Sequence, residues 1–406
     1  MSLPAHLGVG LISVGWMGRL HSRAYLAAAH HYPELAARAV LVMAADPDEG
    51  GRHHAGDVLG YRQTAADYRD VLTNPDVDIV SICSPNFLHR EIALATITAG
   101  KPFWIEKPMG RGVRESREIA RGAATRGLVT SVGFNYRHAP AIALARRLVR
   151  DGAIGTVTNV RVAFMADYSA DPSGALTWRF QRDRAGSGVL GDLLSHGADL
   201  AQYVVGRITS VTAMTETFIT ERPLPRGNAA SHFSKGDDSD PKGVVENEDY
   251  AALMARFEGG AVGVLESSRV AVGPRAEYAL EVYGTTGSLR WDFQRMNELQ
   301  FADGPSGYRT MMMAPHNGEF ARFQPGAGTS MGFDDLKTIE AALFLRSVLE
   351  NRQLAASAAD AWSAAEIVEA AVRSAASGTW VDVPDVDGPT TYDAALEGEV
   401  PAPGGA

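Results

Sequence analysis

The sequence predicts an α/β protein in two parts: a parallel sheet covered by helices, then an α+β part with a large, mostly antiparallel open sheet. Over the first 130 residues, short apolar runs alternate with helical patterns, as in βαβ units. Beyond residue 155, runs of alternating polarity are separated by glycine turns, as in antiparallel strands. At about 100–200 residues per domain, 406 residues suffice for two domains. We expect domains over 1–133 and 134–385, and a peripheral tail, rich in Pro, Gly and acidic residues, over 386–406.

The first part contains strands that are nearly continuous in apolar residues, as expected when both faces of a sheet are covered. Helical patterns follow most of them. We expect strands at Leu7–Ile12, Val40–Ala45, Val77–Cys83, Phe103–Ile105 and Leu128–Gly133, and helices at Met17–Ala29, Phe87–Ala99 and Val113–Thr125.

The second part changes to strands of alternating polarity, interrupted by one long loop. The loop is expected over Arg222–Glu246, which is rich in Pro, Gly and Asp, and loops of that length are usually functional or disordered. Gly378 is placed to end the last helix. Strands are expected at Thr156–Ala166, Tyr250–Phe257, Ala261–Val270, Tyr278–Tyr283 and Ser288–Phe293, and helices at Leu336–Leu349 and Ala355–Ala376.

The composition excludes several classes of protein. With 38 basic and 48 acidic residues the formal charge is −10, so we expect neither a nucleic-acid partner nor an anionic membrane surface. Cys83 is the single cysteine, which excludes an internal disulfide and a cysteine-rich zinc site. No run approaches ~20 apolar residues. We expect a cytoplasmic protein.

The segment Gly10–Gly18 joins the first predicted strand to the first helix and carries a degenerate dinucleotide fingerprint. In G-x-G-x-x-G, the glycines allow a tight turn, close approach of a pyrophosphate, and helix–strand packing. Gly15 and Gly18 fill the second and third places, but Ser13 stands in the first, without the freedom of glycine at positive φ. A plain strand-to-helix turn remains the alternative.

Asp46, at the end of the second predicted strand, favours the nucleotide interpretation. A carboxylate there can accept hydrogen bonds from the adenosine ribose and repels a 2′-phosphate, so NAD is favoured over NADP. Its separation from Gly18 is longer than the usual ~20 residues. The alternative is a helix-capping Asp before Pro47.

Three further segments carry residues suited to chemistry. Ser84–His89 and Glu106-Lys107-Pro108 each follow a predicted strand, at the sheet edge where cofactor crevices form. Asp192 and His196 lie four residues apart after a glycine-rich stretch, so on a helix they share one face. Histidine is the usual proton acceptor near neutral pH, and a carboxylate one turn away can orient it. The alternatives are a surface pair and a metal site, but no third ligand is evident.

In this order, these segments resemble the Gfo/Idh/MocA oxidoreductases. The resemblance implies an N-terminal Rossmann domain, a second domain whose open sheet supports the substrate site, an NAD cofactor and a homodimer or homotetramer. Within the family, residues 168–181 are similar to the glycoside 3-dehydrogenase-like members. The resemblance covers most of residues 7–384 and runs through the glycine turn, Asp46, Ser84–His89, Glu106-Lys107-Pro108, Gly133-Phe134-Asn135-Tyr136-Arg137, Trp178-Arg179, Asp192 and His196.

The resemblance also implies roles for individual residues. Lys107 matches the lysine between nicotinamide and substrate, Asp192 the acid that holds a substrate hydroxyl and the histidine, and His196 the general base. We interpret Tyr136, Tyr168 and Arg179 as substrate-facing, although core aromatics and a structural arginine fit equally. The residues implied to contact the cofactor are Ser13, Val14, Gly15, Trp16, Met17, Asp46, Ser84, Asn86, His89, Glu106 and Lys107.

The implied reaction is oxidation of a secondary hydroxyl, at C3, of a cyclic sugar, anhydrosugar or glycoside, with hydride transfer to NAD and His196 as base. An inositol 2-dehydrogenase, a sugar ketoreductase and an aldose–aldose oxidoreductase are alternatives. A catalytically silent, NAD-binding regulator is an alternative of another class. The joint presence of Lys107, Asp192 and His196 argues against the regulator.

Overall fold

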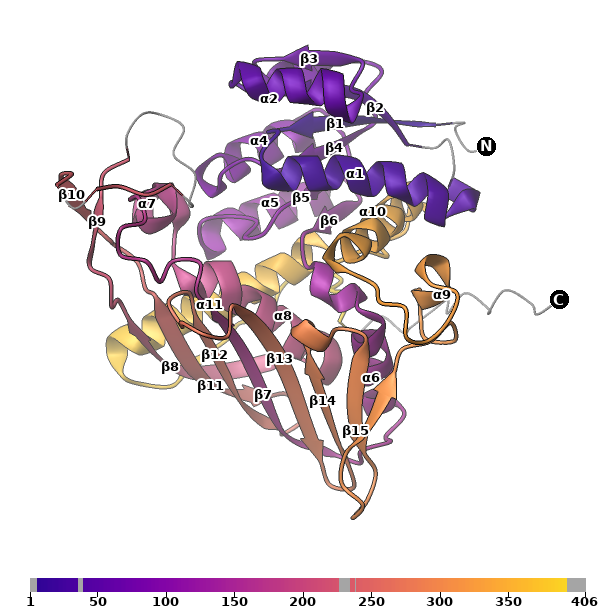
Figure 1. Cartoon of the computed structure of the whole chain (residues 1–406), viewed down its shortest axis with the longest axis vertical. Helices are drawn as coiled ribbons and strands as arrows, with labels where there is room; N and C mark the ends of the chain where they lie inside the picture. Colours follow the sequence, from indigo (N-terminus) through magenta and orange to yellow (C-terminus); the bar gives the residue numbers. More distant parts are fainter. Residues whose placement is uncertain (1–5, 36–38, 226–233, 238, 393–406) are drawn as a thin grey trace.

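The computed structural model describes residues 6–35, 39–225, 234–237 and 239–392. They form two large sheets, one of six and one of nine strands, and a small sheet of two strands (Figure 1). Figure 1 shows the smaller sheet with its helices above the larger sheet, and the helices α10 and α11 between the two. Within these residues, no helix is both long and apolar enough to cross a membrane.

The six-stranded sheet is parallel throughout, in the order β3-β2-β1-β4-β5-β6, which confirms the expected Rossmann-type part. The order reverses between β1 and β4, where open α/β sheets bind ligands beyond the carboxyl ends of the strands. Its strands are β1 (Leu7–Ile12), β2 (Ala39–Ala45), β3 (Gln63–Ala65), β4 (Ile79–Ile82), β5 (Phe103–Ile105) and β6 (Thr130–Val132), and its helices are α1 (Trp16–His31), α2 (Glu49–His53), α3 (Tyr68–Thr73), α4 (Asn86–Thr98) and α5 (Val113–Thr125).

Sequence patterning predicted each of these elements except β3, α2 and α3. The strand β3 is three residues long and polar, and α2 and α3 span five and six residues, so none gives a clear apolar period. The helix α2 is capped by Asp48, whose side chain accepts from the Gly51 N–H. Asp46 is therefore not the cap of this helix.

The nine-stranded sheet has the order β16-β15-β14-β13-β7-β12-β11-β8-β17. Its pairs are antiparallel except β7 with β12, which agrees with the mostly antiparallel sheet expected. Its strands are β7 (Val157–Ala166), β8 (Ile208–Glu216), β11 (Tyr250–Phe257), β12 (Val262–Ser268), β13 (Ala276–Gly284), β14 (Ser288–Asp292), β15 (Glu298–Ala302), β16 (Arg309–Met312) and β17 (Val381–Asp382).

Helices α6 (Pro140–Arg150), α8 (Ser195–Val205) and α11 (Ala358–Ser377) cover one face of this sheet, where the apolar core lies. On the opposite face, Met214, Met254, Val262 and Val264 are exposed. Gly378 ends α11 in the left-handed conformation, as expected.

The last two long helices belong to the second part by sequence, yet they complete the core of the first. Helix α10 (Phe333–Glu350) packs on α1, and its Phe344 and Leu345 join the core cluster around β1. Helix α11 packs on α5, and its Trp362 joins the cluster beneath α5. The second half of the chain is therefore anchored on the Rossmann sheet.

The segment Arg222–Glu246 is not entirely a loop. Strands β9 (Glu221–Pro223) and β10 (Lys242–Val244) pair antiparallel at its base. Arg222 is buried and donates to the Asp171 and Ser169 carbonyls, which ties this hairpin to the stretch that carries Tyr168. Residues 226–233 and 238, within the expected loop, lie outside the described residues.

The start of the expected peripheral tail is packed into the protein. Tyr392 is buried, and its hydroxyl donates to Asp199 Oδ1 at 3.1 Å. Arg137 pairs with the same Asp199 carboxylate, and also donates to Thr391 Oγ1 at 2.7 Å and to Asp360 Oδ2 at 3.4 Å. Thr391 and Tyr392 are thus not peripheral, because two buried carboxylates and one guanidinium hold them. Residues 393–406 lie outside the described residues.

We expect Arg137→Met to lower the free energy of unfolding by about 3–5 kcal/mol, because it leaves Asp199 and Asp360 buried without their cation. Urea denaturation followed by circular dichroism measures this loss. The matched control is Arg161→Met, which removes a pair with Glu281 on an arginine that is 65% exposed, and should change stability by less than about 1 kcal/mol. A loss as small at Arg137 as at Arg161 would contradict this interpretation of the buried cluster.

Candidate active site

The glycine turn after β1 is built for a phosphate. Ser13 has φ +75°, the left-handed conformation that favours glycine, and its N–H donates to the Ala45 carbonyl at 2.8 Å. A Cβ on Gly18 would lie 2.0 Å from the Ser13 carbonyl oxygen, so the turn and α1 are in close contact there. At Gly15 the nearest atom to an added Cβ is 4.0 Å away, which leaves open space beside the start of α1.

The amino end of α1 also fits a pyrophosphate. The helix begins at Trp16 without a side-chain cap and without an acidic residue in its first turn, so its free N–H groups can bind an anion. Val14 is buried, and Trp16 is 65% exposed and stacks on Phe333 of α10. Met17 is half-buried in the same turn.

Asp46 lies directly beyond β2 and faces this turn. Its Oδ2 accepts the Val14 N–H at 2.6 Å, and its Oδ1 accepts the Asp48 N–H at 2.9 Å. Each carboxylate oxygen has a second lone pair, so both can still accept from the hydroxyls of a ribose. The turn and this carboxylate fit a dinucleotide whose ribose carries no phosphate.

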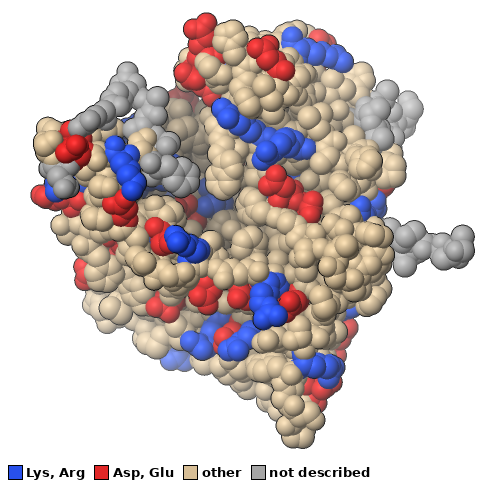
Figure 2. Space-filling model, in the orientation of Figure 1, with Lys and Arg blue, Asp and Glu red and all other residues tan. Residues whose placement is uncertain are grey.

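Lys107 follows β5, and its side chain crosses to the second half of the chain. Its Nζ donates to the Asp192 carbonyl at 2.8 Å and to Asp192 Oδ1 at 3.0 Å. The Lys107 side chain is 16% exposed and that of Asp192 is 35% exposed, so the pair reaches solvent in a cleft. Figure 2 shows this face hollowed between the Rossmann part and the β9–β10 hairpin, with basic side chains visible inside the hollow.

Asp192 is placed by a π-helical turn, Leu190–Leu194, that leads into α8. Glu248 caps this turn, because its Oε1 accepts the Leu190 N–H at 3.0 Å. A Cβ on Gly188 would lie 2.2 Å from the Glu248 carbonyl oxygen, so only glycine permits this approach. Single π-turns within helices are frequent at functional sites.

Three groups face the Asp192 carboxylate. The Tyr168 hydroxyl donates to its Oδ2 at 2.5 Å, opposite the Lys107 ammonium. Burial favours the neutral acid, but Lys107, the Arg179 guanidinium and the Tyr168 hydroxyl outweigh it and lower the pKa of Asp192. Asp192 is therefore a carboxylate at neutral pH. Arg179 lies near enough to act on this charge, and its guanidinium stacks over Trp178.

His196 follows on α8, against an aromatic cluster. Its ring lies 4.8 Å from that of Tyr136, which in turn contacts Tyr278 and Phe293. Burial and the nearby Lys107 ammonium lower the pKa of His196 well below its ordinary value. The imidazole is therefore neutral at neutral pH and can accept a proton.

Within the part of the chain that the structure describes, no hydrogen bond joins Asp192 and His196, although one was expected. The four-residue spacing predicts a shared face on an α-helix, but Asp192 lies within the π-turn and His196 within α8. Asp192 bonds to Lys107 and Tyr168 instead. The structure brings Lys107, Asp192 and Tyr168 into direct contact, with His196 close to the same charges.

The segment after β4 is only partly as expected. His89 is 1% exposed, and its two ring nitrogens lie 2.9 Å from the Pro108 carbonyl and 2.7 Å from the Ser84 carbonyl. It is therefore not an open wall beside a cofactor but a link between this segment and the Lys107-Pro108 turn. Ser84 is also buried, and the Asn86 amide donates to the Ala185 carbonyl at 3.3 Å, across the cleft.

Glu106 is buried beside the turn, and its partners were not predicted from the sequence. Its Oε1 accepts from His21 Nε2 at 2.8 Å and from Lys337 Nζ at 2.6 Å. Burial alone would raise the pKa of Glu106. Lys337 and His21 outweigh this effect, so the pKa of Glu106 lies below its ordinary value. The residues around Glu106 in the sequence do not indicate these partners, because Lys337 lies 231 positions away.

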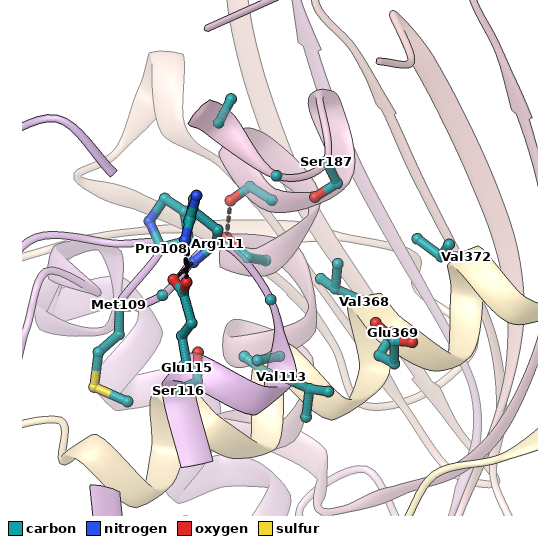
Figure 3. Close-up of a pocket in the computed structure, with 18 of the residues that line it drawn as sticks. Pro108, Met109, Arg111, Val113, Glu115, Ser116, Ser187, Val368, Glu369 and Val372 are labelled. Atoms are coloured by element: carbon teal, nitrogen blue, oxygen red, sulfur yellow. Dashed lines mark hydrogen bonds and ion pairs between the residues drawn. The ribbon is translucent and has the colours of Figure 1, made fainter. Parts of the chain in front are cut away.

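A pocket of about 390 Å³ lies next to the site (Figure 3). It is lined by Pro108, Gly191 and Ser195, the chain neighbours of the three candidate catalytic residues, and by Val368 and Val372 of α11. Figure 3 shows the Arg111–Glu115 ion pair at one side of it. The described residues contain no group of three His, Cys, Asp or Glu side chains that could hold a metal ion.

Comparison with known proteins agrees with this arrangement. The description "Oxidoreductase family, NAD-binding Rossmann fold" matches residues 7–134, and "GFO/IDH/MocA C-terminal domain" matches residues 142–290. The chain is 38% identical over 389 residues to levoglucosan dehydrogenase of Pseudarthrobacter phenanthrenivorans, covering 94% of this chain and 99% of that protein. It is 28% identical to an NAD-dependent scyllo-inositol 2-dehydrogenase of Bacillus subtilis, over 62% of this chain and 66% of that one.

Solved structures give the same result. A levoglucosan dehydrogenase in complex with NADH and levoglucosan has a TM-score of 0.87 at 36% identity, covering 94% of this chain and all of that one (100%). Its complex with NADH and L-sorbose has a TM-score of 0.88 at 37% identity, with 94% and 99% covered. With the parallel sheet, the phosphate turn and the Asp46 carboxylate, these matches show an NAD-binding enzyme: the chain belongs to the Gfo/Idh/MocA family of oxidoreductases.

Proposed function

We propose that this protein is an NAD-dependent dehydrogenase that oxidises the C3 hydroxyl of an anhydrosugar or glycoside, with levoglucosan as the model substrate. The observation that carries the proposal is the meeting of the Lys107 ammonium with Asp192 beside a neutral His196. The similarity to levoglucosan dehydrogenase over nearly the whole of both chains supports the choice of substrate.

In the proposed mechanism, His196 accepts the proton of the reacting hydroxyl. Its neutral imidazole suits this task, because a general base must be deprotonated before the step. Lys107 stabilises the alkoxide as it develops, since an ammonium already fixed by Asp192 needs no reorganisation. The bound NAD supplies the hydride acceptor.

The other site residues position the sugar. Asp192, an acceptor, binds a neighbouring hydroxyl, and Tyr168, whose hydroxyl donates to Asp192, fixes the direction of that carboxylate. Arg179 and Tyr136 contact the remaining hydroxyls and the ring face. Ser13–Met17 and Asp46 hold the pyrophosphate and the ribose, and the Asp46 charge disfavours the 2′-phosphate of NADP. Ser84, Asn86 and Glu106 line the nicotinamide end, with His89 holding Ser84 and the Pro108 turn.

The domain division and the location of the enzyme are part of the proposal. Residues 1–133 form the cofactor domain, since β6 ends at Val132, and 134–385 form the substrate domain. We place the enzyme in the cytoplasm, a reducing compartment, in agreement with its free Cys83 thiol.

The open face of the large sheet supports a homodimer or homotetramer. Met254 of β11 pairs in register with Val264 of β12, and Met214 of β8 pairs with Ala252, so the exposed apolar side chains are contiguous. Apolar patches of this kind mark protein–protein contacts. We propose that a second copy of the chain covers them.

We expect NADH formation, measured by absorbance, with levoglucosan and with alkyl glycosides, and NMR of the product should place the new carbonyl at C3. Inositols and free hexoses in the same assay test the alternative substrates. Turnover of inositols alone would contradict the proposed substrate. Tight NAD binding without turnover of any of these compounds would instead favour the regulator.

We expect Lys107→Ala to lower kcat by ~10²–10³-fold, as the loss of one preformed group that stabilises a developing oxyanion does in other enzymes. Steady-state kinetics with levoglucosan measures this, and circular dichroism checks that the fold is kept. Lys242→Ala, on the exposed strand β10, is the matched control and should retain full activity. A Lys107→Ala enzyme within a few-fold of wild type would disprove the role given to Lys107.

We expect the wild-type protein to be a dimer or tetramer by size-exclusion chromatography with light scattering, and the Met254→Glu/Val264→Glu protein to be smaller. Two carboxylates buried against a second copy would be desolvated without partners. Val272→Glu is the matched control, because Val272 is 82% exposed and lies outside the sheet patch. A monomeric wild type, or an unchanged size for the double variant, would contradict the proposed contact.

A further inference from the structure

Lys337 is a fully buried lysine that the proposed reaction does not use directly. It lies on α10, is 1% exposed, and places its Nζ 2.6 Å from Glu106 Oε1 and 2.9 Å from Glu340 Oε2. The same Nζ lies 5.3 Å from the centre of the Trp104 ring. Removing an ammonium from water costs several kcal/mol, so a buried lysine is retained in a stable protein only where its partners offset that cost.

The partners of Lys337 converge on Glu106. His21, on α1, stacks on Trp104 at 3.4 Å and donates its Nε2 hydrogen to the same Glu106 oxygen. On the other side, a Cβ on Gly133 would lie 2.5 Å from Glu106 Oε2, so the backbone after β6 encloses the carboxylate. Elements from both halves of the chain thus fix Glu106.

Glu106 is joined directly to Lys107, whose ammonium must meet Asp192. Lys337 comes from the half of the chain that also carries Asp192 and His196, whereas Glu106 directly follows the Rossmann strand β5. The Lys337–Glu106 pair is therefore a second bridge between the two halves, one residue away from the Lys107–Asp192 bridge. A shift of α10 relative to β5 would displace the Lys337–Glu106 bridge, and with it the residue that precedes Lys107 in the chain.

We propose that Lys337 is a positioning residue. Its ammonium holds Glu106 in place, and through Glu106 it keeps the neighbouring Lys107 at the position where it meets Asp192 beside His196. This inference rests on the proposed dehydrogenase function. Lys337 does not touch the reacting atoms; it sets the place of the group that does. It also contributes charge, because Lys337 is one of the cations that lower the pKa of His196.

The test is Lys337→Met, which keeps the length of the side chain and removes its charge. We expect kcat to fall by ~10²-fold, since a displacement near 1 Å of a catalytic group costs about that much, with a smaller change in the KM for the sugar. Asp334→Asn is the matched control on the same helix: Asp334 is 61% exposed, pairs with Arg23 on the surface, and should leave kcat unchanged.

The pH dependence separates this role from general destabilisation. Lys337 lowers the pKa of His196, so its removal should raise that pKa and move the acidic limb of the kcat/KM profile to higher pH. NMR titration of the His196 ring in the cofactor-free protein, assigned with His196→Asn, should show the same upward shift. A merely less stable enzyme would keep the wild-type limb and the wild-type titration.

A second pair of variants keeps the inference testable if Lys337→Met does not fold. If Lys337 acts through Glu106, then adding Lys337→Met to Glu106→Gln should lower kcat by less than ~3-fold further, because residues that act as a unit are not additive. If the losses of kcat in the two single variants multiply in the double variant, the inference is overturned. It is also overturned if Lys337→Met keeps the wild-type kcat and the wild-type titration of His196. A wild-type enzyme inactive on all the sugars would instead refute the proposed function, and the His196 titration would still decide the role of Lys337.

Discussion

The contact between the Lys107 ammonium and Asp192 is the interaction on which the rest of the site depends. One partner follows a parallel strand of the Rossmann sheet, and the other lies on a π-turn of the second half, so neither half contains a site by itself. The local structure around it is correspondingly constrained. Gly188 admits the Glu248 backbone that caps the π-turn, and His89 links the Pro108 turn to the end of β4. α10 and α11, anchored in the Rossmann core, keep the two halves in place.

The same ammonium contributes to the charge state of both groups that flank it. It helps to keep Asp192 ionised despite burial and to keep His196 neutral. In the proposed mechanism, Asp192 accepts hydrogen bonds from hydroxyls and His196 accepts a proton, and the two roles are distinguished by the environment of each side chain. The aromatic side of Tyr136 excludes water from one face of His196, which strengthens these electrostatic effects.

Much of the fold and part of the site could be predicted from the sequence. Buried parallel strands are continuous apolar runs, so β1, β2, β4, β5 and β6 were evident, and the order of Lys107, Asp192 and His196 indicated the family. Prediction failed where long-range or irregular geometry decides the outcome. The π-turn that carries Asp192 leaves no periodic pattern in the sequence, and Asp192 bonds to Lys107 and Tyr168 rather than to His196. Lys337 looks like a solvent-facing lysine on a helix, because only the tertiary fold brings it to Glu106. The short strands β3, β9 and β10 are too brief for their periodicity to be read.

A double-mutant cycle on kcat/KM for levoglucosan tests the central claim most directly, with Lys107→Met, Asp192→Asn and the variant that carries both. If the ammonium and the carboxylate act as one unit across the cleft, the double variant should be little slower than the slower single variant, because the second substitution removes an interaction that is already lost. Losses that multiply, so that each side chain contributes independently of the other, would contradict the account.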